Sequence, residues 1–394
     1  ESFQSSSLWE TDSDDFIGFM NYRSESRSGW KQDIIFKKRV KSFEDNITTT
    51  DYSLAKVLLG FERDHKPIRW ELQAKTEESF LEKRAIVYDS VGVGLGQYRY
   101  DPDFNTYISD PNGAFISYTI PTGKRDPSTV IEGSQKFTID LGKISGFPNI
   151  TIRGNNRLDY RGSGIEIKKL MQPNITDSLS TLSRLNSRLE MIYYGKNRFR
   201  SWIDNQQALN GLDPRGNDVD QSNEFGLEIN QTLSPLMTIK NSGQFRKKYV
   251  ESTVSDLRNR DVKGWWNEIQ LQVKLSESMD FDLGLMGGFD SGNQQGKPFS
   301  SQAYGLLLNG RFFFKKTGRF QSQISWVNAA EKNKLPYLPP EALNGFPVGT
   351  SFRSNTRLQY FLNRSVSMIF TLNTIDDSRY DNFITFQGEI RAHF

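Results

Sequence analysis

The chain has 394 residues, with 50 basic against 47 acidic side chains and a formal net charge of +3. This balance excludes a polyanion-binding signature, and the absence of cysteine excludes disulfides and Cys-based zinc sites. The mean hydropathy is −0.61, and no stretch approaches the ~18 consecutive apolar residues of a membrane helix. A helical membrane protein is therefore excluded, but a β-barrel is not, because its strands carry only one apolar residue in two.

The N-terminal part, residues 1–150, alternates apolar and polar side chains, although less regularly than the rest. Ile68 and Trp70 stand two apart, and segments 14–26 and 30–42 flank a tight Ser-Gly turn. We predict four to six barrel strands here, with a separate β-domain as the alternative. The chain begins without an initiator Met or a secretory segment, so we expect a mature form or a piece of a longer protein.

One acidic stretch has the spacing of a calcium loop. Asp101, Asp103 and Asn105 alternate as ligands do in such a loop, but the required Gly and the bidentate Glu at the twelfth position are missing. Asp-Pro and Pro-Asn-Gly sequences are also ordinary turn chemistry. We therefore expect no cofactor, with Ca²⁺ at these three residues as the weaker interpretation.

Residues 151–184 interrupt the alternation and are predicted to be a connector, with folding into a barrel lumen as one alternative. Residues 185–394 return to the alternating pattern in ten segments. In the last of them Ile384 and Phe386 oppose Thr385, which gives one apolar and one polar face. The segment at 185–394 is therefore predicted to supply the C-terminal ten strands of a barrel.

The lengths of the connections separate a barrel from a soluble sandwich, whose strands alternate too. Long and short connections alternate along 185–394, with long loops expected at 198–222 and 330–350. A membrane barrel places tight turns on the periplasmic side and extended loops outside. The predicted fold is thus all-β: an antiparallel transmembrane β-barrel of about 14–18 strands with short periplasmic turns and long extracellular loops.

Aromatic side chains, 13% of the residues, gather at both ends of the predicted strands. Rings with an apolar body and a polar edge favour the two membrane interfaces, so we predict two aromatic belts. The loop-end belt comprises Trp265, Phe289, Tyr304, Trp326 and Phe352, and the turn-end belt comprises Phe281, Phe312, Phe320 and Tyr360.

The face opposite the apolar one carries charges of both signs, which predicts a solvated or salt-bridged lumen. A pore whose charge rings set ion preference is the functional interpretation, with Arg353, Arg357 and Arg391 forming a local cationic stripe. The predicted lumen-facing charged residues are Arg188, Glu190, Glu224, Glu228, Lys240, Glu268, Lys274, Asp280, Asp282, Arg311, Arg353, Arg357, Glu389 and Arg391.

The chain ends on an aromatic residue that closes a strand. Here it resembles outer-membrane proteins, whose last strand ends in an aromatic and is read by the barrel-insertion machinery. The matching residues are Gln387, Gly388, Ile390, Ala392 and Phe394. The glycine sits one place early, and alanine stands in place of the usual larger group. The resemblance implies recognition by the insertion machinery.

Two longer runs carry a second resemblance. VGVGLGQYRYDPDFNTYISDPNGAFISYTIPTG at 91–123 and LPYLPPEALNGFPVGTSFRSNTRLQYFLNRSVSMIFTLN, followed by the terminal GEIRAHF, are similar to large, functionally uncharacterised bacterial outer-membrane proteins. In those proteins the second run belongs to the C-terminal barrel region. The resemblance covers about a third of the chain and implies an architecture, but it names neither a substrate nor a catalytic residue.

Catalysis is not expected. The two histidines, His65 and His393, fall in a predicted tight turn and at the predicted periplasmic end, away from any triad or shared metal site. We expect a conduit in the bacterial outer membrane: a pore, or the barrel of an export or surface-assembly system. A structural anchor or subunit of an envelope complex, and a soluble secreted β-sandwich, are the alternatives. Expected partners are outer-membrane lipid, the insertion machinery and envelope proteins at the long loops, but no nucleic acid.

Overall fold

The computed structural model describes residues 2–3, 9–10, 13–43, 49–163, 175, 179–314, 317–335, 337–363 and 365–392. Almost all of them lie in β-strands, and no helix in these ranges has the length and apolarity needed to cross a membrane. The first strands are β1 (Ser2–Phe3), β2 (Trp9–Glu10), β3 (Ser13–Glu25), β4 (Trp30–Phe43), β5 (Thr49–Phe61), β6 (Ile68–Ser90), β7 (Gly96–Asp101), β8 (Thr106–Gly113), β9 (Phe115–Asp140) and β10 (Ile150–Gly162).

The chain continues as a series of long strands joined mostly by short turns. They are β11 (Ser180–Tyr194), β12 (Asn197–Asp213), β13 (Gly216–Ser234), β14 (Met237–Ser252), β15 (Arg260–Ser276), β16 (Met279–Gln294), β17 (Lys297–Phe314), β18 (Gly318–Glu331), β19 (Gly349–Phe361), β20 (Val366–Asp377) and β21 (Tyr380–Ala392). Among the described residues, the connections contain three short 3-10 helices: η1 (Leu141–Lys143), η3 (Asp256–Arg258) and η4 (Ala342–Gly345).

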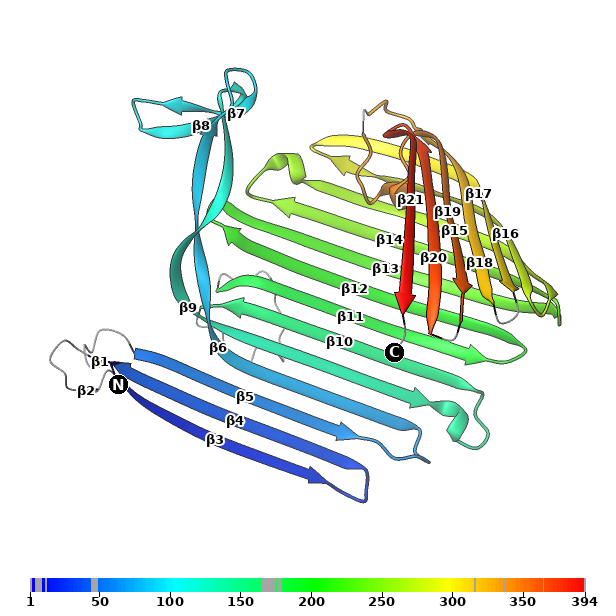
Figure 1. Ribbon diagram of the computed structural model, residues 1–394, viewed down its shortest axis with the longest axis horizontal. Helices are drawn as coiled ribbons and strands as arrows, with labels where there is room; N and C mark the ends of the chain where they lie inside the picture. The colour runs from blue at the N-terminus through cyan, green and yellow to red at the C-terminus, as the bar shows by residue number, and fades with distance from the viewer. Residues whose placement is uncertain are drawn as a thin grey trace.

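The main sheet is an antiparallel meander of seventeen strands, β3–β6 followed by β9–β21, in which each strand pairs with the next. This number lies within the predicted 14–18. No register joins β3 to β21 in the described part of the chain, and the two strands stand well apart in Figure 1. The sheet is therefore curved but open.

The side chains alternate along these strands as a pleat requires. In β16, Leu283, Leu285 and Phe289 are exposed, whereas Asp282 and Asp290 are buried. We call the face that carries Asp282 and Asp290 the inner face, because the connector 332–348 packs on it. The opposite face is the outer face.

A two-stranded ribbon projects from the sheet. The first part of β6 lies between β5 and β9. From Phe80↔Pro127 to Ser90↔Phe115, β6 and β9 pair with each other, and among the described residues the one further pairing is that of Phe115 with Tyr98 of β7. The ribbon rises beyond the neighbouring strands and carries the β7–β8 hairpin at its tip (Figure 1). Arg215, in the β12–β13 turn, donates a hydrogen bond of 2.5 Å to Ser117 and so ties the ribbon to the sheet.

Two predicted connections are strands in the structure. The loop expected at 198–222 is wrong: it forms β12 and the start of β13, so eleven strands rather than ten lie between Ser180 and Ala392. Likewise 151–162, assigned to a connector, belongs to β10. Both errors have one cause. Both faces of these segments carry polar residues, so the apolar alternation that marks a strand is weak there.

The rest of the predicted connector at 151–184 lies mostly outside the described residues. Ile175 is buried, and its carbonyl accepts a hydrogen bond of 2.7 Å from the Ser183 hydroxyl. In the register of β11, Ser183 lies on the outer face. Ile175 therefore packs against the side of the sheet opposite η4, and not on the inner face.

Candidate functional site

The connector 332–348, which we call the inner loop, folds back onto the inner face. It is described except for residue 336, and η4 contacts β15, β16 and β17. Leu343 is fully buried in a cluster with Trp266 and Val327, against which Phe346 packs. The rings of Trp266 and Phe346 are stacked, with centroids 6.2 Å apart. The inner loop is therefore a packed element of the inner face.

Asp290 holds the middle of the inner loop. Its side chain is 1% exposed and its Oδ2 lies 2.7 Å from the Arg246 guanidinium. The same oxygen accepts a hydrogen bond from the Leu343 backbone N–H. Gly264, opposite Asp290 in the register, leaves room for the carboxylate, because a Cβ there would lie 1.7 Å from Oδ1. A buried carboxylate with these partners fixes the loop to β14 and β16.

A second carboxylate, on the loop itself, pairs with the wall. Glu341 accepts hydrogen bonds from Arg260, at 2.7 Å from Nη2 and 2.9 Å from Nε, in a bidentate arrangement. Lys248 lies 3.9 Å away. At the far end of the loop, the Gly345 carbonyl accepts hydrogen bonds of 3.0 Å from Arg353 and 3.1 Å from Arg379. The inner loop is thus held to the wall at three successive points.

The backbone at these contacts is strained. Leu343 and Asn344 have φ values of +48° and +54°, in the left-handed region that side chains other than glycine rarely adopt. Such residues persist only where their surroundings hold them, and they concentrate at clamps and switches. The three contacts with the wall supply that restraint.

Acid is expected to release the inner loop only at low pH. Burial acts to raise the pKa of Glu341, but the Arg260 hydrogen bond and the charges of Arg260 and Lys248 outweigh it, so the pKa lies below 4.5. A carboxylate whose pKa falls on folding stabilises the folded state above its ordinary pKa and loses this contribution as the pH drops through the lowered value. A nitroxide at Tyr337→Cys, an exposed loop position, should stay immobile from pH 7 to 5 and gain mobility in more acidic solution.

The control for this prediction removes the titrating group. In Glu341→Gln the acid-dependent step should disappear, because no carboxylate remains to be protonated at that position. Release of the loop between pH 7 and 5 in the unmodified protein would contradict the assignment of the step to Glu341.

The registers place all fourteen predicted lumen-facing charged residues on the inner face. Many are paired across strands. Arg188 lies 3.2 Å from Asp204, Lys240 lies 3.6 Å from Glu228, and Glu190 accepts a hydrogen bond from Arg200. Many charges on the inner face are therefore neutralised by ion pairs between neighbouring strands.

The predicted cationic stripe is largely neutralised. Arg353 lies 3.5 Å from Asp377, and Arg391 lies 2.7 Å from Glu389. Arg357 is two strands from Glu389 and shares the inner face with it. The other predicted charges form two groups on this face. Glu224 lies on β13 and Glu268 on β15, with β14 between them. Lys274, Asp280, Asp282 and Arg311 lie together on β15, β16 and β17.

All nine predicted belt aromatics lie on the outer face by register. Trp265 pairs with Phe289 and Trp326 pairs with Phe352 near one end of the strands, and Phe312 pairs with Phe320 near the other. Tyr304, Phe281 and Tyr360 are 61%, 41% and 45% exposed. The apolar and charged sets of the sequence thus occupy opposite faces of one sheet.

The sequence also predicts places for the insertion-signal residues and the two histidines. Gln387, Gly388, Ile390 and Ala392 lie in β21, but Phe394 and His393 fall outside the described residues. His65 is exposed in the β5–β6 turn.

The acidic stretch near the β7–β8 hairpin uses its oxygens locally. Asp101 accepts a hydrogen bond of 3.0 Å from the Asp103 backbone, and Asn105 accepts one of 2.7 Å from Tyr100. In the described residues, no three or more His, Cys, Asp and Glu side chains are grouped to hold a metal. The observed contacts are those of a turn.

Sequence reasoning missed the residues that hold the inner loop. Arg246 and Asp290 follow the strand alternation, so their face could be found, but their pairing spans 44 positions. The Arg260–Glu341 pair spans 81. The signal for a packed loop was the run of apolar residues between prolines at 335–347. From the sequence we expected the long loops to contact envelope proteins instead.

The fold and the arrangement of faces define the class. The chain is an all-β, antiparallel protein with one curved, open sheet, an apolar outer face and a charged inner face that carries a folded loop. No protein-family model matches the chain, and neither does any curated protein.

Two of the solved structures to which the chain is similar are import receptors. The ferric-catecholate import receptor Fiu from E. coli K12, in its closed form, has 11% identity and a TM-score of 0.38, over 96% of this chain and 73% of that one. The ferric yersiniabactin uptake receptor FyuA from Yersinia pestis has 9% identity and a TM-score of 0.41, over 96% of this chain and 71% of that one. We infer no activity from similarities of this size.

Proposed function

We propose that the protein is an integral barrel of the bacterial outer membrane that acts as a conduit, with the inner loop narrowing its lumen. One observation carries the proposal: a single sheet exposes apolar side chains on one face, and on the other carries paired charges and an anchored loop. Lipid outside and water inside would satisfy both faces at once.

The outer face supports contact with lipid. Phe225, Phe245, Trp265 and Phe289 pair in one row across four strands and are 45%, 52%, 40% and 57% exposed. A contiguous exposed apolar surface of this kind is rare on soluble monomers. Its continuation over neighbouring strands favours a membrane over a single protein partner.

The identity of the transport system is a further part of the proposal. The similarity to the C-terminal region of large outer-membrane proteins supports a pore or the barrel of an export or assembly system. The proposed partners are outer-membrane lipid and the insertion machinery. We propose a role without catalysis and without a cofactor, which is supported by the exposed turn position of His65 and the local use of the Asp101 and Asn105 oxygens.

Single-channel recording in a planar bilayer tests the conduit. The purified protein should conduct ions, and Glu341→Gln should open more often or pass a larger current, because the loop loses its ion pair with Arg260. Glu277→Gln, at an exposed turn position, is the matched control and should behave as the unmodified protein. A barrel that stays electrically silent in all three forms would contradict the proposal.

The open edges favour a second candidate, a structural subunit of an envelope complex. Unpaired edge strands offer backbone groups to further strands. In the described part of the chain, β3 pairs with β4 alone and β21 pairs with β20 alone, so each has one free edge. Native purification from membranes tests this candidate. Recovery with partner proteins supports it, and recovery of the chain alone as a closed monomer contradicts it.

A further inference from the structure

The inner face between β15 and β21 carries a row of polar side chains, most of them amides. The registers join Asn309, Gln323, Asn355 and Asn373 across four neighbouring strands. The row begins at Gln272 and Asp282 on β15 and β16 and ends at Thr385 on β21. Amides thus dominate this row, whereas ion pairs such as Arg188–Asp204 and Lys240–Glu228 lie on the wall formed by β11–β14.

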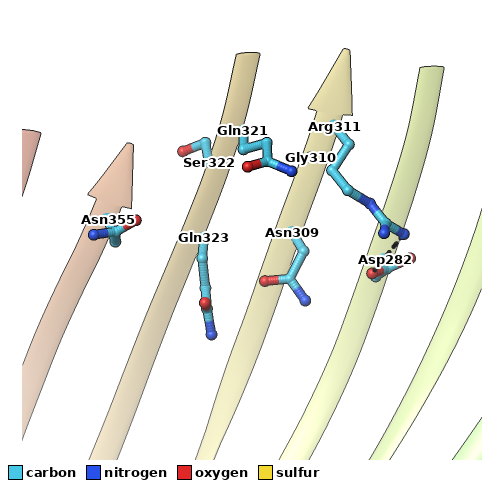
Figure 2. Close-up of a pocket in the computed structure, with 8 residues that line it drawn as sticks. All are labelled: Asp282, Asn309, Gly310, Arg311, Gln321, Ser322, Gln323 and Asn355. Atoms are coloured by element: carbon cyan, nitrogen blue, oxygen red, sulfur yellow. Dashed lines mark ion pairs between the residues drawn. The ribbon is translucent and has the colours of Figure 1, made fainter. Parts of the chain in front are cut away.

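A pocket of about 300 Å³ opens on this row. Asp282, Asn309, Gln323 and Asn355 line it at one level of four adjacent strands, and Arg311 reaches from β17 toward Asp282 (Figure 2). The size is at the lower end for sites that bind small molecules. The pocket is therefore large enough for a small solute but not for a folded macromolecule.

Asp282 supplies an independent indication of a ligand. The residue is 7% exposed, and its inaccessible Oδ1 accepts no hydrogen bond from the described residues. Its Oδ2 lies 3.8 Å from Arg311, which is too far for a hydrogen bond. Buried carboxylate oxygens are normally hydrogen-bonded. Within the described residues, Oδ2 is therefore an acceptor without a donor on a residue that lines the pocket, and a hydroxyl group of a bound solute would satisfy it.

The donor and acceptor types define the class of solute. An amide offers both a carbonyl acceptor and two N–H donors, and a hydroxyl group likewise donates and accepts. The nearby charges balance, with Lys274 and Arg311 against Asp280 and Asp282. Resting on the proposed conduit function, we propose that this pocket binds a neutral polyhydroxylated solute of the size of a mono- or disaccharide.

Equilibrium binding to the purified full chain tests the proposal without relying on conduction. Isothermal titration with glucose, maltose and sorbitol should show saturable binding of at least one, unchanged between low and high salt, because a neutral solute has no charge to screen. The Gln323→Ala/Asn355→Ala double variant should bind about tenfold more weakly, since two side chains that hydrogen-bond the solute are lost. Gln244→Ala, on the inner face of β14 outside the pocket, should bind as the unmodified protein.

The outcomes separate this proposal from the conduit. No saturable binding of the three neutral probes, or binding that the double variant leaves unchanged, would overturn the saccharide assignment even if the protein conducts. Preferential, salt-sensitive binding of glutamate or lysine would overturn it too and would mark a site for charged solutes. Saccharide binding by an electrically silent protein would support the pocket and count against the conduit alone.

Discussion

The Asp290→Ala variant is expected to lose about 3–5 kcal/mol of folding free energy, the cost of leaving one member of a buried ion pair without its partner. Asp290 is 1% exposed and is the carboxylate that meets both Arg246 and the Leu343 backbone N–H. Its removal takes the 2.7 Å partner from a partly buried guanidinium and frees the inner loop. Urea unfolding in lipid vesicles measures the first effect, and the mobility of a nitroxide at Tyr337→Cys measures the second.

Two further variants make this prediction specific. Asp280→Ala removes a carboxylate 3.9 Å from Arg311 on the same face, and a pair this loose and partly exposed should contribute less than about 1 kcal/mol. If Asp290→Ala fails to fold, Asp290→Asn keeps an acceptor for the Leu343 N–H and should show a smaller loss with a mobile loop. A stable Asp290→Ala protein with an immobile loop would contradict the anchoring role.

A charge on the outer face should prevent stable insertion, whereas the same charge on the inner face should not. Ile269 is 45% exposed on the outer face in the middle of β15, and Gln270, the next residue, lies on the inner face. Arginine on the lipid face of a barrel near the bilayer centre costs about 2–4 kcal/mol. Ile269→Arg should therefore lower the folded fraction in vesicles markedly, while Gln270→Arg, beside Glu268, should fold as the unmodified protein does.

The measurement is the fraction of heat-resistant folded protein on a gel, together with the urea midpoint, for the two arginine variants side by side. Equal tolerance of arginine at both positions would mean that the outer face meets water. Equal intolerance would mean that both faces are buried in protein, as in a sandwich.

The regular strands could be predicted from the sequence because they meet two different environments. In β16 and β21 one face is apolar and the other charged, so the alternation itself reveals the strand and assigns its faces. β12 was missed because its two faces are not separated in this way. Asn205 and Gln207 lie on its outer face, and Asp204 and Gln206 lie on its inner face. A segment polar on both faces reads as a loop.

The site could be predicted only in part. The pleat fixes which side of the sheet a charge occupies, so the fourteen inward charges could be assigned to one face. Which of them pair, and with what, depends on the register and on a loop that returns to the wall. The contact of Glu341 with Arg260 joins residues 81 positions apart, and no periodicity in the sequence encodes it.

The central claim is that the outer face touches lipid, and site-directed spin labelling along β16 tests it most directly. The chain contains no cysteine, so single cysteines at successive positions from Asp282 to Gly288 can be labelled without background. Odd positions, which lie on the outer face, should be accessible to oxygen dissolved in lipid and closed to a water-soluble nickel reagent, and even positions should lack this lipid signature. Odd positions open to the nickel reagent, or no two-residue period at all, would contradict the account.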